Sequence, residues 1–152
     1  MRTRLKSRQR RGNALIEFAV LWSLLFPLVG GTAQFGNAFY QYNNLCSSVR
    51  NAARYASVQT YHSASNTVPA DFQTAVQNMV RYENPAPAAG ATPLYNVPPD
   101  KIQVTMTFAN NVPDTVTVTI TQFDIDTVIK TFTINNKPST SFPFLGRWDP
   151  LP

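Results

Sequence analysis

An apolar stretch without formal charge lies near the start of the chain. Residues 18–49 contain no Asp, Glu, Lys or Arg, and the first half of this run, residues 18–33, is strongly apolar. With residues 14–16 the apolar segment reaches about 20 residues, the length that a helix rising ~1.5 Å per residue needs to cross the hydrocarbon of a bilayer. We expect one transmembrane helix at about residues 14–34.

A helical spacing continues beyond this segment, where the chain becomes more polar. Apolar or small residues recur at alternating steps of four and three: Phe35, Phe39, Tyr42, Cys46, Val49, Ala53 and Ala56. This spacing is typical of a helix that packs lengthwise against another helix, while the opposite face carries Asn44, Ser48 and Asn51. We predict one long helix over residues 13–61, with this helix packing seam facing a partner.

A different pattern follows in residues 62–152, which we call the head. Residues 62–66 are small and polar, as in a connector. Pro69 and the apolar spacing after it predict a short amphipathic helix over residues 69–82. Residues 83–99 are rich in proline and predict a linker without regular structure.

Alternating apolar and polar residues then predict strands. The alternation runs over residues 102–108 and 116–121, with turn residues at 110–114 between them. A change of phase predicts a β-bulge near Gln122, and a third strand is expected at about 128–134. We expect the aromatic residues of the C-terminal tail to cover the sheet. The predicted fold class is α+β: a long N-terminal helix, a short second helix, and a small antiparallel sheet of about three strands with both helices on one face.

The distribution of charge bears on partners and on orientation. The chain has 13 Lys and Arg against 8 Asp and Glu, and its net charge of +5 first suggests a nucleic-acid partner. Six cations precede Gly12, so the rest of the chain has 13 − 6 = 7 cations and all 8 acids. The basic character therefore belongs to a leader, residues 1–12, and we expect no nucleic-acid binding. Because positive flanks of a transmembrane helix stay in the cytoplasm, we expect the N-terminus inside and the head outside.

The composition argues against catalysis and against a metal site. One Cys excludes an internal disulfide and Cys-rich zinc motifs, and one His excludes a two-His metal site. Asp124 and Asp126 lie on the same side of a strand, where two solvated carboxylates are a simpler interpretation than a metal-binding Asp-x-Asp motif. The sequence contains no glycine-rich phosphate loop and no nucleophile elbow. We expect no enzyme activity, no catalytic residue, no cofactor and no metal.

The junction of leader and helix carries a motif that resembles a known family. Gly12, followed by Asn13-Ala14-Leu15-Ile16-Glu17-Phe18, resembles the processing site of type IV prepilins. Over about residues 10–58 the chain resembles the TadE-like family, minor pilins or pseudopilins of the tight-adherence (Flp) pilus system. The residues that carry this resemblance include Arg11-Gly12, Glu17-Phe18-Ala19, Pro27, Phe35-Gly36 and Arg50-Asn51-Ala52-Ala53-Arg54-Tyr55-Ala56.

Three features depart from the family pattern. Gln34 stands where family members often have an acid before Phe-Gly, so a role for charge at this position does not carry over. Ala52 stands where Gly is common. The C-terminal Arg147-Trp148-Asp149-Pro150 resembles the family's terminal string only loosely, so the resemblance rests on the N-terminal helix.

The resemblance implies a structural subunit with a type IV pilin-like fold. Prepilin peptidase would cleave after Gly12 and leave Asn13 as the first residue. The other implied partners are further pilin or pseudopilin subunits, contacted through the N-terminal helix, and the inner-membrane assembly platform. The protein would be a single-pass protein of the bacterial inner membrane, with its N-terminus cytoplasmic and its head periplasmic, for incorporation into an extracellular pilus.

Glu17 is a carboxylate inside the apolar segment, where a buried charge costs about 2.5–3.5 kcal/mol. In one interpretation it lies at the membrane interface, near the basic leader. In the other, Glu17, next to Phe18, takes part in subunit pairing. Its carboxylate would bind the α-amino group of Asn13 in a neighbouring subunit, so that assembly removes the desolvation cost of both charges.

Other interpretations of the sequence stay open. Arg50 and Arg54, one turn apart, form either a solvated basic strip or contacts with acids of a neighbouring subunit. Gly31-Thr32-Ala33 resembles a small-x-small signal peptidase site, and cleavage after Ala33 would release a secreted soluble binding domain. The chain is also compatible with an uncleaved, signal-anchored membrane protein.

Overall fold

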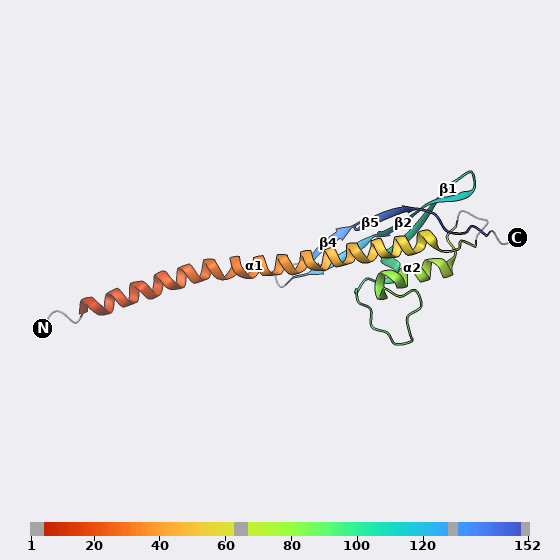
Figure 1. The fold of residues 1–152 in the computed structure, drawn as a ribbon. Coiled ribbons are helices and arrows are strands. Elements are labelled where there is room, and N and C mark those ends of the chain that lie inside the picture. Colours follow the sequence, from red (N-terminus) through yellow and green to blue (C-terminus); the bar gives the residue numbers. More distant parts are fainter. Residues whose placement is uncertain (1–4, 63–66, 128–130, 150–152) are drawn as a thin grey trace. The chain divides into compact units, whose positions relative to one another are not determined.

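The computed structural model describes residues 5–62, 67–127 and 131–149, with side chains described from residue 12 onward. Two compact units divide the chain: unit 1, Met1–Phe39, and unit 2, Tyr40–Pro152. In chain order the elements are α1 (Leu5–Val58), α2 (Ala70–Tyr82), the short 3-10 helix η1 (Pro99–Lys101), β1 (Ile102–Ala109), β2 (Val112–Ile120), β3 (Gln122–Asp126), β4 (Thr131–Asn135) and β5 (Ser139–Pro143) (Figure 1). The α+β fold class with a long N-terminal helix, a short second helix and a small antiparallel sheet is confirmed.

Helix α1 begins earlier than the sequence pattern predicts. It starts at Leu5, within the basic leader, and runs through both units to Val58. At its end, the Ser57 carbonyl accepts a hydrogen bond from the Leu145 amide at 2.7 Å. The last carbonyl groups of a helix have no partner within the helix, so the C-terminal segment stabilises this end.

The main sheet has three antiparallel strands in the order β1-β2-β5. Strands β1 and β2 form a hairpin around Asn110 and Asn111, whose φ angles of 52° and 64° are those that asparagine tolerates in tight turns. The predicted turn at 110–114 is therefore too long, because pairing resumes at Val112. The register of this hairpin shifts between Thr107 and Phe108.

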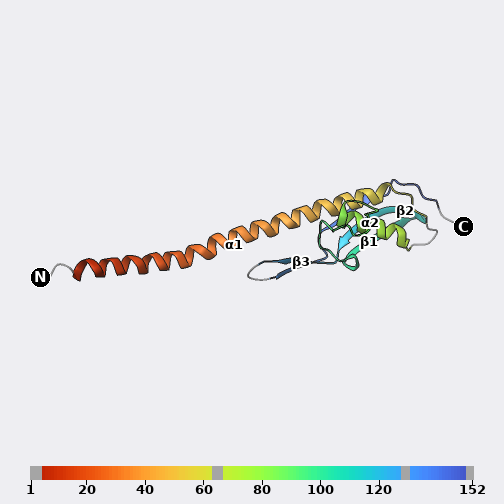
Figure 2. The same cartoon turned by 90° about the horizontal axis from the view of Figure 1, so that it is seen from below.

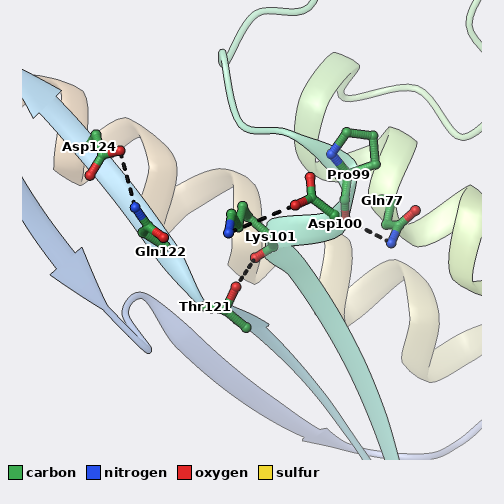
Figure 3. A network of polar contacts seen from close by, with 7 residues as sticks. All are labelled: Gln77, Pro99, Asp100, Lys101, Thr121, Gln122 and Asp124. Carbon is green, nitrogen blue, oxygen red and sulfur yellow. Dashed lines mark hydrogen bonds and ion pairs between the residues drawn. The ribbon is translucent and has the colours of Figure 1, made fainter.

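The predicted bulge near Gln122 is wrong, because the chain changes sheets there. Strand β2 ends at Ile120, and β3 pairs with β4 in a separate two-stranded sheet. Thr121 lies at the junction, where its amide donates to the Lys101 carbonyl at 2.8 Å and its side chain donates to the same oxygen at 3.2 Å (Figure 3). The change of phase in the sequence marks this junction, at which the chain leaves one sheet and enters the other.

Two further strand predictions change in the structure. The third strand, expected at about 128–134, corresponds to β4, while residues 128–130 lie outside the described residues. The tail is predicted only to cover the sheet, but Ser139–Pro143 forms β5 and pairs with β2 from Thr115↔Pro143 to Thr119↔Ser139. This edge strand forms because it pairs with β2, which is distant in sequence. Its apolar and polar residues alternate too little for the strand to be predicted from its own sequence. Of the predicted connector at 62–66, residues 63–66 also lie outside the described part.

The core of unit 2 lies between the helices and one face of the main sheet (Figures 1 and 2). Alternate residues of β1 and β2 point into it, and α2 contributes its apolar face, as the predicted amphipathic helix requires. Since α1, α2 and the sheet share one cluster of buried side chains, both helices cover the same sheet face. The cluster comprises Leu45, Val49, Ala52, Ala53, Ala56, Tyr61, Phe72, Val76, Val80, Val97, Ile102, Val104, Met106, Val116, Val118 and Ile120.

Tyr61 is the largest fully buried side chain in this core. Its ring contacts Phe72, Phe108 and Phe144 at centroid distances of 5.7, 6.0 and 6.3 Å. Its hydroxyl donates to the Thr67 carbonyl at 3.0 Å, so the polar group is satisfied despite its burial. One side chain thus joins the end of α1 to α2, β1 and the C-terminal segment.

Candidate assembly surface

The part of α1 in unit 1 exposes nearly all of its apolar side chains. Leu24 is 75% exposed and Phe35 is 70% exposed. By length and composition, α1 is the one helix in the described part of the chain that could cross a membrane. Exposure of this much apolar surface to water is unfavourable, so this helix requires lipid or another protein as its surroundings.

The residues of the predicted processing site lie on this exposed helix. Gly12 and Asn13 are both exposed and helical, and a Cβ built on Gly12 meets no atom within 4 Å. Glu17 is also exposed, and none of the described residues forms a salt bridge with it. Among the residues whose side chains are described, therefore, no contact requires glycine at position 12 and no cation pairs with the carboxylate of Glu17.

Phe18 belongs to a row of aromatic side chains that the sequence analysis missed. Its ring lies 6.0 Å from that of Trp22, and the rings of Trp22 and Phe26 lie 6.3 Å apart. The signal was present in the sequence, since residues four apart are neighbours on a helix surface. All three rings are more than half exposed, so the row widens the apolar surface available to lipid or a partner helix.

The helix packing seam divides into an exposed and a buried part. Phe39 is 60% exposed, whereas Tyr42 and Cys46 are partly buried. Val49, Ala53 and Ala56 are fully buried, and they pack in the core of unit 2. In the second half of α1, therefore, the partner of the seam is the chain's own head.

The buried face of α1 is rotated slightly from the predicted seam. Leu45, Ser48 and Ala52 are 0% exposed, although the helical spacing places Ser48 on the polar face opposite the seam. The Ser48 hydroxyl donates to the Val80 carbonyl of α2, and this bond allows a polar side chain to be buried there. The prediction for Ser48 is wrong because helical spacing alone does not reveal a carbonyl on another element.

Arg50 and Arg54 lie on the exposed side of α1 in unit 2. They are one turn apart, and the structure brings neither side chain to an acidic residue of the described chain. The two salt bridges among described residues join Lys101 to Asp100 at 3.9 Å and Arg147 to Asp149 at 3.8 Å.

The two-stranded sheet carries a polar face with two carboxylates. Asp124 and Asp126 project from the same side of β3, opposite Thr133 and Thr131 of β4. Each threonine hydroxyl donates to the facing carboxylate at 2.7 Å. Among the described residues, no group of three or more His, Cys, Asp or Glu side chains is placed to hold a metal ion.

The similarity of this chain to known proteins lies in the long helix α1. Residues 12–54 match the family model described as TadE-like protein. The N-terminal segment is TadE-like. This match confirms the family resemblance inferred from the residues around Gly12, Glu17 and Arg50. No curated protein and no solved structure matches the chain.

The TadE-like match lies within helix α1. It covers the exposed apolar part of α1 and most of the part buried in unit 2, and it ends before the strands begin. The match indicates similarity to TadE-like proteins over the N-terminal helix, which by length and composition could cross a membrane.

Proposed function

We propose that this chain is a minor pilin or pseudopilin of a tight-adherence (Flp) pilus, cleaved by prepilin peptidase after Gly12. The observation that carries the proposal is that the TadE-like segment includes the part of α1 in unit 1, where the large apolar side chains are exposed in the described chain. In the membrane, lipid surrounds these side chains, and in a filament the helices of other subunits replace the lipid. The assembly platform of the inner membrane would mediate this transfer.

The orientation follows from the position of the charges. Six cations precede Gly12, and the positive flank of a transmembrane helix stays in the cytoplasm. The head then lies in the periplasm until the subunit enters a pilus. Cleavage after Gly12 removes the cationic leader, which would otherwise oppose the withdrawal of the helix from the bilayer.

Cleavage after Gly12 would create a binding partner for the carboxylate of Glu17. The new α-amino group of Asn13 is a cation at the edge of the apolar segment, and Glu17 is an anion four residues later. Each charge alone is costly in a low-dielectric environment, and pairing between neighbouring subunits reduces both costs. Phe18, beside Glu17, adds apolar contact to the same subunit pairing site.

N-terminal mass spectrometry of the protein from its native host tests the proposal. A mature chain beginning at Asn13 is the expected result. A chain beginning at Gln34 would instead identify a secreted soluble domain released after Ala33, and an intact leader would identify an uncleaved membrane anchor. Either of these outcomes would contradict the proposed function.

Matched variants sharpen this test. Gly12→Val should leave the leader attached while the fold is retained, because a Cβ at Gly12 meets no atom within 4 Å. Gly31→Ala, which also meets open space, is the control that should be processed normally. Glu17→Ala should be processed and inserted but should enter filaments at least tenfold less, whereas Asp71→Ala, at an exposed acid of the head, should enter them normally. Normal filament incorporation of Glu17→Ala would rule out the pairing of Glu17 with Asn13.

A further inference from the structure

Helix α1 presents a cationic face that the described chain leaves uncovered. Arg50 and Arg54 are exposed, and no salt bridge or hydrogen bond joins either guanidinium to another described residue. The two residues are four apart on the helix, so their Cα atoms are separated by about 6 Å along its axis. This pair of cations, which we call the Arg strip, has a fixed spacing.

The polar face of the β3–β4 sheet presents two carboxylates that are held in place. Thr133 and Thr131 donate to the Oδ1 atoms of Asp124 and Asp126, both at 2.7 Å. The Gln122 amide donates to Oδ2 of Asp124 at 3.3 Å (Figure 3). Because these bonds fix the carboxylates before any partner arrives, a binding partner would lose less side-chain entropy on pairing with them.

A pocket adjoins these carboxylates. It has a volume of about 270 Å³ and is lined by Asn96, Pro98, Lys101, Gln122, Phe123, Asp124 and Asp126. Lys101 is the one cation in this lining, and its ammonium lies 3.9 Å from the carboxylate of Asp100 (Figure 3). With Lys101 paired in this way, the pocket keeps an excess of negative charge and suits a cationic side chain.

The two surfaces match in charge and in spacing. Residues two apart on a strand are separated by about 6.6 Å, close to the ~6 Å between Arg50 and Arg54. A guanidinium binds a carboxylate through two parallel hydrogen bonds, and two such pairs side by side fix an orientation. We propose that Arg50 and Arg54 of one copy of this chain bind Asp126 and Asp124 on the β3–β4 sheet of a second copy.

This contact is repetitive. Each copy has one Arg strip and one carboxylate face, so a first copy bound to a second leaves one surface of each kind free. Such a head-to-tail interface continues from copy to copy and produces a ring or a helical filament. The inference rests on the proposed function, since it names residues through which successive pilin-like subunits would contact each other outside the membrane.

Charge exchange between two tagged copies tests the contact. R50E/R54E and D124R/D126R, each expressed as the sole copy, should reduce co-purification of differently tagged subunits from native membranes at least tenfold. When the two variants are expressed together, each reversed strip meets a reversed carboxylate face of opposite charge, so co-purification should recover. Failure of the mixture to recover would overturn the proposal, as would undiminished association of either variant alone.

The control is K137E/R147E, which reverses two exposed cations elsewhere in unit 2 and should co-purify as the wild type does. Cysteine cross-linking provides a second measurement that tolerates weak association. In a Cys46→Ser background, a copy with Arg54→Cys and a copy with Asp126→Cys should form a covalent heterodimer on mild oxidation. A pair with Lys137→Cys in place of Asp126→Cys should not. Absence of a cross-link between positions 54 and 126 in assembled protein would contradict the contact.

The outcomes also separate this inference from the proposed function. If the mature protein begins at Asn13 and enters filaments, but charge exchange has no effect, only the Arg–Asp contact is wrong. If the exchanged charges restore association and the cross-link forms, while the leader stays attached and no filament contains the protein, the proposed pilus function is wrong and the contact stands.

Discussion

Leu25 and Val49 lie on the same helix, yet one side chain is 52% exposed and the other is 0% exposed. Both belong to one apolar pattern that runs in phase from the membrane segment into unit 2. In unit 2, α1 packs against the chain's own α2 and sheet, whereas the large apolar side chains of α1 in unit 1 are exposed. One continuous helical pattern therefore includes a stretch that packs inside the chain and a stretch that stays exposed and available to lipid or other subunits.

The largest expected effect comes from emptying the core of unit 2. Tyr61→Ala removes a fully buried ring with three aromatic contacts, and we expect a loss of about 3–5 kcal/mol in the stability of unit 2. Trp22→Ala, in the exposed aromatic row of unit 1, should leave that stability unchanged. Hydrogen exchange measured by mass spectrometry on the full chain in detergent follows unit 2 directly. If the amides of unit 2 were equally protected from exchange in both variants, the core of unit 2 and the exposed part of α1 would not differ in their contribution to stability.

A smaller effect is expected from enlarging a buried residue of α1. Ala53 is 0% exposed, and Ala53→Leu should destabilise unit 2 by about 1–3 kcal/mol through overpacking. Ala19→Leu makes the same change on the exposed part of α1 and should have little effect on the fold. Urea unfolding followed by a probe in unit 2 measures both. Tolerance of Ala53→Leu would mean that this face of α1 is not closely packed.

The buried hydrogen bond of α1 allows a finer comparison. Ser48→Ala removes the donor to the Val80 carbonyl and should cost about 1 kcal/mol. Ser47 is exposed and donates to the Asn43 carbonyl of its own helix at 3.2 Å, so Ser47→Ala should be close to neutral. The same urea titrations measure both variants. An equal loss in the two would show that burial does not distinguish these serines.

The smallest expected effect is a pH dependence confined to unit 2. Burial, with a further contribution from the Glu83 carboxylate, raises the pKa of the Tyr95 phenol above its usual 10.0. The unfolded chain therefore releases the phenol proton at a lower pH than the folded chain does. The contribution of Tyr95 to stability is complete below about pH 10 and is lost as the pH rises further. Tyr95→Phe should flatten the decline of unit 2 stability above pH 10. An unchanged slope in this variant would assign the decline to another group.

Structural features that depend on residues close in sequence were predicted better than features that depend on contacts between distant segments. The α2 helix and the β1–β2 alternation followed from spacing alone, because one face of each element is apolar. Strand β5 was missed because Ser139–Pro143 becomes a strand by pairing with β2, whose partner residues lie 20 to 28 positions earlier, from Thr119↔Ser139 to Thr115↔Pro143. The burial of Ser48 was missed for a similar reason, since its acceptor lies 32 residues away on α2.

The sequence by itself determined the basic leader, the apolar segment, the Gly12–Phe18 motif and the long helix, because these depend on local composition and spacing. Only the tertiary structure decided which face of α1 is covered, where the chain changes sheets, and that Asp124 and Asp126 share a polar face with two threonines. The physical reason is that burial, sheet pairing and the orientation of carboxylates are set by contacts between distant segments, whose free energy exists only once the chain has folded.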